Sequence, residues 1–139
     1  MAIWNDHFYN GIDEYSDGDV EEEIFDYVQN PEESLEAFIG DSYAKGYHLL
    51  PIRENILNWY PFRKDQAALE IGAGCGAITG ALCDKLKKVV SVDLSERRSK
   101  INYERHKKAE NLTIMVGNLN DMQFEEKFDY VILNGVLEY

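Results

Sequence analysis

Short apolar runs alternate with amphipathic stretches along the second half of the chain. The apolar runs predict four strands, over residues 67–71, 89–93, 112–116 and 128–133. The last run is almost entirely apolar, as expected of a strand covered on both faces. Helices are predicted over residues 77–86 and from Ser95, as N-cap, to about Ala109. This order, with its short connections, predicts parallel strands, right-handed crossovers and a Rossmann-like α/β sheet.

The first half predicts helices and turns instead. Acidic residues followed by spaced apolar ones predict a helix over residues 20–29, capped by Asp19. Asn30, as cap, and Pro31 predict the start of a second helix that ends at Gly40. Pro51 predicts the start of a third helix, whose inward face would hold Ile52, Ile56, Leu57 and either Trp59 or Tyr60.

The composition changes near residues 61–66. We therefore divide the chain into an acidic helical N-terminal segment (residues 1–62), which would act as a lid or cap, and a partial cofactor-binding domain (residues 63–139). Residues 1–16 carry aromatic side chains without a clear period and are predicted to form an arm.

The net charge of −12 comes entirely from the N-terminal segment. Thirteen acidic residues and no Lys or Arg lie within residues 1–44, and the rest of the chain is nearly neutral. Such a surface repels nucleic-acid phosphates and anionic membranes, which argues against nucleic acid as a partner. Two interpretations remain open: a solvated face, or a docking segment for a basic partner.

Targeting and metal-binding signals are not found in the sequence. No apolar run reaches the ~18 residues of a membrane span, and the N-terminus lacks the features of a signal peptide. The two cysteines, Cys75 and Cys83, do not form a disulfide framework, so a cytoplasmic location is expected. Three scattered histidines and no Cys/His cluster predict no metal site.

The candidate chemistry begins where the first strand of the second half ends. Glu70 is followed by three alternating glycines, Gly72, Gly74 and Gly76, and then by a predicted helix. Glycines let the backbone turn tightly and approach a ligand closely. Because parallel sheets bind ligands at the carboxyl ends of their strands, Glu70 would place an anion at such a site.

Two later strand ends carry polar side chains as well. Asp93 ends the second of these strands, where a carboxylate can accept both hydroxyl protons of a ribose. Asn118 follows the third, where an amide can contact the edge of an adenine.

These elements together resemble the class I S-adenosylmethionine-dependent methyltransferases over residues 67–139. The resemblance rests on E-x-G-x-G-x-G from Glu70, the acid Asp93, the G-N-L turn at 117–119 and the run F-D-Y-V-I-L-N-G-V-L-E-Y at 128–139. It implies S-adenosyl-L-methionine (SAM) as cofactor, S-adenosyl-L-homocysteine (SAH) as product, and a three-layer sandwich with strands in the order 3-2-1-4. More loosely, residues 47–53 are similar to the helical lead-in of uncharacterised bacterial members.

The resemblance also implies a cofactor-binding set. Glu70, Gly72, Ala73 and Gly74 would line the methionine and ribose part of SAM, and Asp93 would hold the ribose hydroxyls. The remaining members would be Leu94 packed on the adenine, Asn118 and Leu119 at its rim, and Asn134 beside the methionine moiety and the methyl group. No catalytic base is assigned, and Glu138 is the candidate nearest to the expected position.

Two departures from the family pattern shape the expected function. Asn134 is followed by Gly-Val-Leu and not by the Pro-Pro of enzymes that methylate nucleic-acid amino groups. With the acidic charge, this favours a small-molecule or glycan-related acceptor, although residues 70–80 resemble rRNA dimethyladenosine transferases. The family's strands five to seven are not present, so we expect a truncated domain whose apolar fourth strand lies at the sheet edge and pairs with a second copy, directly or by swapping.

Alternatives to this interpretation remain. Gly72-x-Gly74-x-x-Ala77 with Asp93 also fits a NAD(P)-dependent oxidoreductase, and the acidic segment fits a non-catalytic interaction module. The basic helix near residues 97–108 is interpreted as a solvated face, paired in part with the acidic segment, in preference to an RNA-binding surface. Cys75 is interpreted as space-filling. His48 could reach the pocket, but a surface position is expected.

Overall fold

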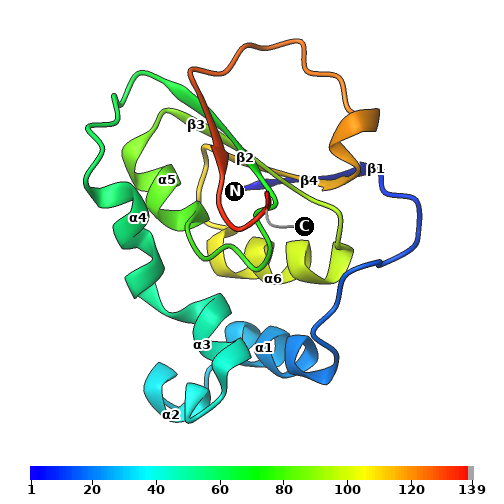
Figure 1. Cartoon of the computed structure of the whole chain (residues 1–139), viewed down its shortest axis with the longest axis vertical. Coiled ribbons are helices and arrows are strands. Elements are labelled where there is room, and N and C mark those ends of the chain that lie inside the picture. Colours follow the sequence, from blue (N-terminus) through cyan, green and yellow to red (C-terminus); the bar gives the residue numbers. More distant parts are fainter. Residues whose placement is uncertain (138–139) are drawn as a thin grey trace.

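A parallel five-stranded sheet forms the centre of the computed structural model, which describes residues 1–137 (Figure 1). Its strands are β1 (Ile3–Phe8), β2 (Ala67–Ile71), β3 (Lys88–Asp93), β4 (Leu112–Gly117) and β5 (Tyr130–Leu133). Their order in the sheet is β1-β4-β3-β2-β5. The four strands expected from the second half therefore lie in the predicted order 3-2-1-4, and the Rossmann-like α/β fold is confirmed.

The N-terminal segment adds a strand that the sequence did not predict. Ile3 and Trp4 in β1 lie opposite Thr113 and Ile114 of β4, in parallel register. The interpretation of these residues as an arm was therefore wrong for residues 3–8. Strand β1 lies at the edge of the sheet and is partly exposed on both faces, so it lacks the alternating pattern by which half-buried strands are recognised.

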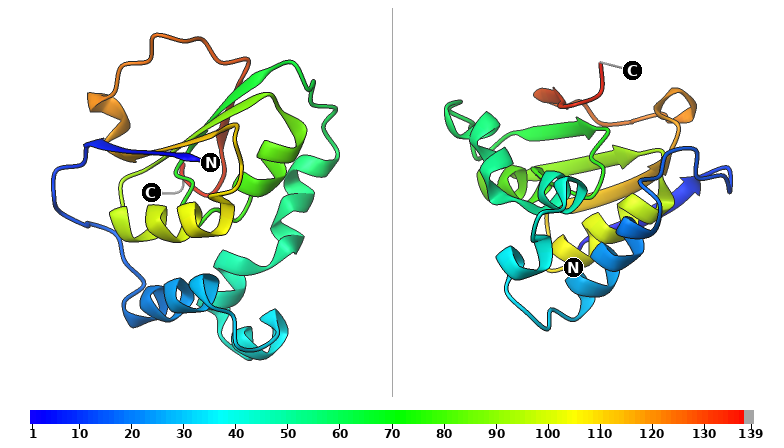
Figure 2. Two further views of the ribbon diagram at one scale, coloured as in Figure 1. Left: turned by 180° about the vertical axis from the view of Figure 1, so that it is seen from behind. Right: turned by 60° about the horizontal axis from the view of Figure 1, so that its bottom comes forward.

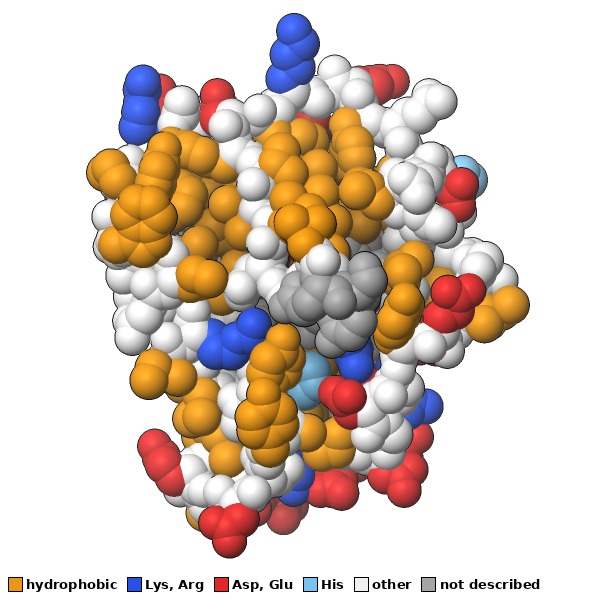
Figure 3. Space-filling view, viewed as in Figure 1, with side chains coloured by type: hydrophobic (Ala, Val, Ile, Leu, Met, Phe, Trp, Pro, Cys, Tyr) orange, Lys and Arg blue, Asp and Glu red, His pale blue; other side chains and the backbone are white. Residues whose placement is uncertain are grey.

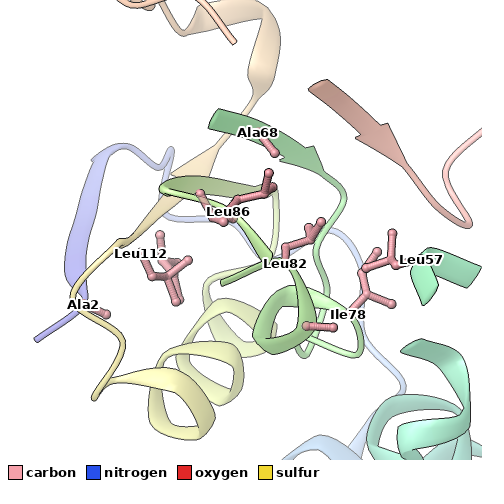
Figure 4. Packing of buried hydrophobic residues seen from close by; sticks show 10 residues of the cluster. Ala2, Leu57, Ala68, Ile78, Leu82, Leu86 and Leu112 are labelled. Atoms are coloured by element: carbon pink, nitrogen blue, oxygen red, sulfur yellow. The ribbon is translucent and has the colours of Figure 1, made fainter. Parts of the chain in front are cut away.

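Helices cover only one face of the sheet within the described residues. The helices α5 (Thr79–Lys85) and α6 (Glu96–His106) lie on that face, as the tilted view of Figure 2 shows. Between them and the sheet lies the main hydrophobic core (Figure 4), which includes Ala68, Leu82 and Leu112.

The other face is covered by the linker between β4 and β5 instead of by a helix. This linker contains the short 3-10 helix η2 (Leu119–Asp121). Its Met122, Phe124 and Phe128 pack against a second core that includes Val90 and Val92. The third layer of the expected sandwich is thus an irregular segment with three large apolar side chains.

The N-terminal helices form a separate group at one end of the sheet. They are α1 (Asp19–Gln29), α2 (Leu35–Ile39), α3 (Tyr43–Leu49), the 3-10 helix η1 (Pro51–Glu54) and α4 (Asn55–Asn58). Helix α1 packs against α6, and Ile24 and Ile101 meet in a third hydrophobic cluster. None of the helices formed by residues 1–137 has the length and apolar character needed to cross a membrane.

Several expected helix boundaries were wrong. Helix α1 follows Gly18 without a side-chain cap, although Asp19 was expected to provide one. Helix α2 begins at Leu35, where the Ser34 hydroxyl accepts from the Ala37 N–H, and not at the Asn30-Pro31 signal. The local helix-start signal at Asn30-Pro31 is thus outweighed by the cap at Ser34, which sets the start of α2.

The helix predicted from Pro51 also differs from the structure. It is split into η1 and the single turn α4, and only Leu57 of its expected inward face is buried. The other four side chains are exposed, with Trp59 at 77%. Only the turn that contains Leu57 contacts the hydrophobic core, so the other apolar side chains of residues 51–60 lie outside the core.

Strand β5 lies at the edge of the sheet, as the sequence predicted. It pairs with β2 on one side, and no strand formed by residues 1–137 pairs with its other side. Val131 and Leu133 are 55% and 43% exposed, although the apolar sequence suggested a strand covered on both faces.

Candidate functional site

A cavity of about 770 Å³ opens at the carboxyl ends of the central strands. One wall is formed by the loops that follow β2, β3, β4 and β5, and the other by the N-terminal segment. All nine residues that the sequence assigned to cofactor binding line this cavity: Glu70, Gly72, Ala73, Gly74, Asp93, Leu94, Asn118, Leu119 and Asn134. Segments separated by more than 60 residues in the sequence therefore meet at one place.

The three glycines of the loop after β2 have different surroundings. All three have positive φ angles, 69° at Gly72, 56° at Gly74 and 80° at Gly76, a region that favours glycine. A Cβ at Gly76 would lie 2.2 Å from Oδ1 of the buried Asn102, so close packing on α6 excludes a side chain. A Cβ at Gly74 would meet no atom within 4 Å. The loop thus packs against the helix at Gly76 and leaves open space beside Gly74.

Glu70 is a buried carboxylate at the end of β2. One of its oxygens, Oε2, accepts hydrogen bonds from the hydroxyls of Ser91 (2.5 Å) and Thr79 (2.7 Å). The other, Oε1, has no hydrogen-bond partner among the described residues. Burial raises the pKa of Glu70 to about 7, although both hydroxyl donors oppose this shift. Glu70 therefore presents an available acceptor to the cavity, and its proton equilibrium lies near neutral pH.

Asp93 joins the glycine loop to the start of α6. Its Oδ2 accepts from the Gly74 N–H (2.7 Å) and its Oδ1 from the Ser95 N–H (2.9 Å). Burial raises the pKa of Asp93, and these two backbone donors counteract the shift. Each carboxylate oxygen can accept a further hydrogen bond, so Asp93 can hold the loop and a ligand hydroxyl together.

The remaining predicted residues lie at the rim of the cavity. The amide oxygen of Asn118 accepts from the Asn120 N–H (2.9 Å), which fixes the side chain at the start of η2. Leu94 is partly exposed, and Asn134 follows directly after β5. Glu138 lies outside the described residues.

The N-terminal segment, which was expected to act as a lid or cap, supplies a wall of polar and aromatic side chains. This wall consists of Tyr15, Ser16, Asp17, Tyr43, Tyr47, His48 and Arg53. Figure 3 views this side of the molecule, with hydrophobic side chains over the sheet and acidic ones along the end formed by α1 and α2. Only the lead-in at residues 47–53 gave a sequence signal, and no spacing rule connects it with residues 15–17.

His48 is buried, contrary to the expected surface position. Its side chain is 5% exposed, and its Nε2 lies 2.7 Å from Oδ2 of Asp17. Burial lowers the pKa of His48, and the hydrogen bond with Asp17 opposes this change. The surface expectation failed because helix α3, which buries this face, was not recognised in the sequence.

The acidic segment is paired with the basic helix α6. Nε of Arg98 lies 2.7 Å from Oε1 of Glu21, and its Nη2 lies 3.2 Å from Oδ2 of Asp17. Arg97 lies 3.5 Å from a carboxylate oxygen of Glu22. The interpretation of this helix as a partly paired face is therefore confirmed.

A further acid of the same segment caps α6. The carboxylate of Asp13 accepts hydrogen bonds from the backbone N–H groups of Glu96 (3.0 Å) and Arg97 (3.1 Å). A carboxylate at this end of a helix satisfies free donors and interacts favourably with the helix dipole. The part of the chain before α1 is thus fixed next to the cavity.

Cys75, in the glycine loop, is a buried thiol. Burial raises its pKa to about 12, so it is protonated at neutral pH and unreactive. This agrees with its interpretation as a space-filling residue.

Comparisons with known proteins connect this geometry to one family. Residues 68–139, just over half of the chain, match the family model described as a methyltransferase domain. A probable ribosomal RNA small subunit methyltransferase A of Methanosarcina acetivorans is 38% identical over 66 residues, which are 48% of this chain and 24% of that protein. The chain thus matches about a quarter of the length of its first curated relatives.

Solved structures agree with this match. Phosphoethanolamine N-methyltransferase 1 of Haemonchus contortus, in complex with phosphoethanolamine and SAH, aligns with a TM-score of 0.56 and 26% identity, covering 81% of this chain and 24% of that one. A dimethyladenosine transferase of Plasmodium falciparum aligns with a TM-score of 0.52 and 26% identity, covering 60% and 31%.

Proposed function

Because the chain belongs to the methyltransferase domain family, we propose that it binds SAM in the 770 Å³ cavity and transfers its methyl group to an acceptor. SAH, the product, is present in the aligned Haemonchus contortus enzyme. The observation that carries the proposal is that two carboxylates, Glu70 and Asp93, line the same cavity as Gly74, beside which the glycine loop leaves open space.

The groups that line the cavity fit the chemistry of this cofactor. SAM carries a ribose with two hydroxyl donors, an adenine, and an amino acid part with an ammonium group. Asp93 would accept from the ribose hydroxyls, and Oε1 of Glu70 would accept from a ribose hydroxyl or from the ammonium group. The backbone at Gly74 permits close approach because no Cβ intervenes.

The rim residues would contact the two ends of the cofactor. Leu94 and Leu119 would pack against the adenine, and the Asn118 amide would contact its polar edge. Asn134 would lie beside the methionine part, and Gly72 and Ala73 would border it through their backbone. We propose these roles for the residues because all of them line the same cavity.

The task of the protein in this reaction is to position the reactants. The cofactor supplies a methyl group bonded to a positively charged sulfur, which is reactive by itself. The chain holds it next to the acceptor and limits access of water, and such positioning accounts for a large share of catalysis in cofactor enzymes.

We further propose a small-molecule or glycan-related acceptor in place of a nucleic acid. The net charge of −12 and the acidic surface of α1 and α2 support this choice, since phosphate backbones bind to clustered positive charge. Much of the basic character of α6 near the cavity is already paired with acids. The relatives that act on ribosomal RNA make RNA the competing acceptor for the test.

Location and assembly complete the proposal. Two unpaired cysteines support a reducing, cytoplasmic location.

The exposed apolar edge of β5 supports association of two copies through this strand, because an unpaired apolar edge offers a row of backbone donors and acceptors.

Calorimetric titration with SAH tests the proposal, with NAD as the control ligand. We expect binding of SAH and no binding of NAD. Asp93→Ala should weaken the SAH affinity at least tenfold, because a charge-assisted hydrogen bond contributes about 1.5–3 kcal/mol. Asp84→Ala, which removes an exposed acid on α5, serves as the matched control.

The possible outcomes separate the alternatives. Binding of NAD would favour an oxidoreductase, and binding of neither ligand would contradict the proposed function. If SAH binds, transfer of a labelled methyl group from SAM to fractionated RNA and to small-molecule fractions distinguishes the two acceptor classes.

A further inference from the structure

A chain of polar contacts leads from the buried Glu21 of α1, through the partly exposed Arg98 and Asp17, to the buried His48 in the cavity wall opposite the glycine loop. Glu21, which has no exposed surface, binds Nε of Arg98, and Arg98 also contacts Asp17. Asp17 in turn lies 2.7 Å from Nε2 of His48. The Asp17 backbone N–H also donates to the buried Glu21 (3.0 Å), so Asp17 is held by Glu21 and Arg98 in a position that faces His48.

The partner of Nε2 determines the state of the His48 ring. Because Asp17 is a carboxylate, it accepts a hydrogen bond, and Nε2 must carry the proton in the neutral ring. Nδ1 is then the unprotonated nitrogen, and it has no hydrogen-bond partner among residues 1–137. A basic nitrogen without a partner, on a ring held by a carboxylate, is the arrangement of an oriented general base.

His48 is also fixed relative to the glycine loop. Nη1 of Arg105 donates to the backbone carbonyl of His48 (3.0 Å) and to that of Cys75 (2.6 Å). A single guanidinium thus joins the end of α3 to the loop next to the proposed cofactor site. His48 and Glu70 line the same cavity from its two walls.

We propose that His48 takes up the proton that the methylated compound loses during transfer, and that Asp17 positions the His48 ring. The inference rests on the proposed function. The acceptor's nucleophilic atom would form a bond to the methyl carbon of SAM. The bond between this carbon and the sulfur of SAM would break, and its electron pair would stay on the sulfur. The acceptor's proton would move to Nδ1 of His48. The carboxylate of Asp17 stabilises the resulting imidazolium. The acceptor is therefore an amine or hydroxyl compound that carries a proton to be removed.

The surrounding charges are consistent with a base that acts at neutral pH. Burial lowers the pKa of His48, so the ring is neutral and able to accept a proton. Asp17 and Glu21 favour the protonated ring, whereas Arg98 disfavours it. Arg105, from the same face of α6, contacts the His48 backbone.

Nuclear magnetic resonance of the ring nitrogens tests the inference without a known acceptor. The chain has three histidines, His7, His48 and His106, and His48→Gln identifies the relevant signals. The protein is titrated with acid and base in complex with SAM and in complex with SAH. These ligands differ by the methyl group and one positive charge, and the glycine-loop amides report that each is bound.

We expect neutral His48 to carry its proton on Nε2, and its pKa to be lower with SAM than with SAH. A positive charge close to the ring opposes a second one. His106 does not line the cavity, so its titration should be the same in both complexes. Asp17→Asn should lower the pKa of His48 in the SAH complex, because the anionic partner of Nε2 is lost, whereas Asp19→Asn, an exposed neighbour, should leave it unchanged.

Other results would overturn the inference. If both ligands bind and His48 titrates identically with each, the ring is a structural partner of Asp17 and does not face the methyl group. If the neutral His48 ring carried its proton on Nδ1 and not on Nε2, the inference would also be contradicted. If neither ligand shifts the glycine-loop amides, the proposed function itself fails.

Discussion

Nε of Arg98 lies 2.7 Å from Oε1 of Glu21, a carboxylate with no exposed surface. The same carboxylate accepts from the Ser16 hydroxyl (3.1 Å) and from the Asp17 N–H (3.0 Å). Glu21 therefore connects the segment before α1 to α6. A buried carboxylate with three donors is a structural centre of the N-terminal wall.

We expect Glu21→Gln to lower the free energy of unfolding by about 2 kcal/mol, because it leaves the buried side of Arg98 without its anionic partner. Glu22→Gln, one residue later, removes a largely exposed carboxylate and should change stability by less than about 0.5 kcal/mol. Urea unfolding of the two variants measures the difference. Equal losses would show that the Glu21 pair does not contribute specifically to stability.

The elements around the glycine loop could be predicted from the sequence because their signals are local. Glu70, the three glycines and Asp93 each stand at the end of an apolar run or directly after it, and parallel topology brings such ends to one edge. The N-cap at Ser95 was also correct, since its hydroxyl accepts from the Arg98 N–H. Local sequence was sufficient for this half of the site.

The sequence suggested a lid on the opposite side, but the contacts that build this wall could not be predicted, because they are long-range. Asp17 meets His48 across 31 residues, and Asp13 caps a helix that begins more than 80 residues later. No periodic pattern encodes such pairs. Strand β1 was not predicted for a related reason. Its backbone pairs with β4, which is distant in the sequence, and its Asn5, Asp6 and His7 are at least partly exposed, so the strand has no apolar pattern.

Glu70 should make the stability of the chain depend on pH. Burial raises its pKa from the usual 4.5 to about 7, so the folded state holds a proton that the unfolded state releases. The contribution of this group is fully present below pH 4.5 and is lost as the pH rises to about 7. The difference amounts to about 3 kcal/mol in the free energy of unfolding.

Glu70→Gln removes this titration while keeping an oxygen acceptor for Ser91 and Thr79. We expect the variant to be less affected than the original chain by a change from pH 4.5 to pH 7.5 in urea unfolding. Glu110→Gln, an exposed acid after α6, is the control and should follow the original chain. Parallel curves for Glu70→Gln and the original chain would mean that Glu70 is ionised throughout this range.

Association through β5 should be visible in sedimentation. Val131, 55% exposed on the unpaired edge, would be covered in a dimer, so Val131→Lys should shift the chain to a monomer. Ile3→Lys changes a similarly exposed residue on the opposite edge strand and should leave association unchanged. A monomer at micromolar concentration for the original chain would contradict the proposed dimer, and dissociation by Ile3→Lys alone would assign it to the other edge.

Two glycines of the loop should separate folding from cofactor binding. Gly76→Ala places a Cβ against Asn102, whose amide donates to the Thr79 hydroxyl, and the backbone at residue 76 has a positive φ that disfavours alanine. We therefore expect the free energy of unfolding to fall by about 3 kcal/mol. Gly74→Ala meets no atom, so only its backbone conformation is unfavourable, by about 1 kcal/mol.

The effects on SAH affinity should have the reverse order, because only the Cβ at Gly74 would enter the cavity. Calorimetry should show at least a tenfold weaker affinity for Gly74→Ala, and nearly unchanged affinity for the folded fraction of Gly76→Ala. If Gly74→Ala bound SAH as tightly as the original chain, the cofactor would not approach this part of the loop. The open space beside Gly74 would then have a different role, and the assignment of the cofactor to this end of the cavity would be wrong.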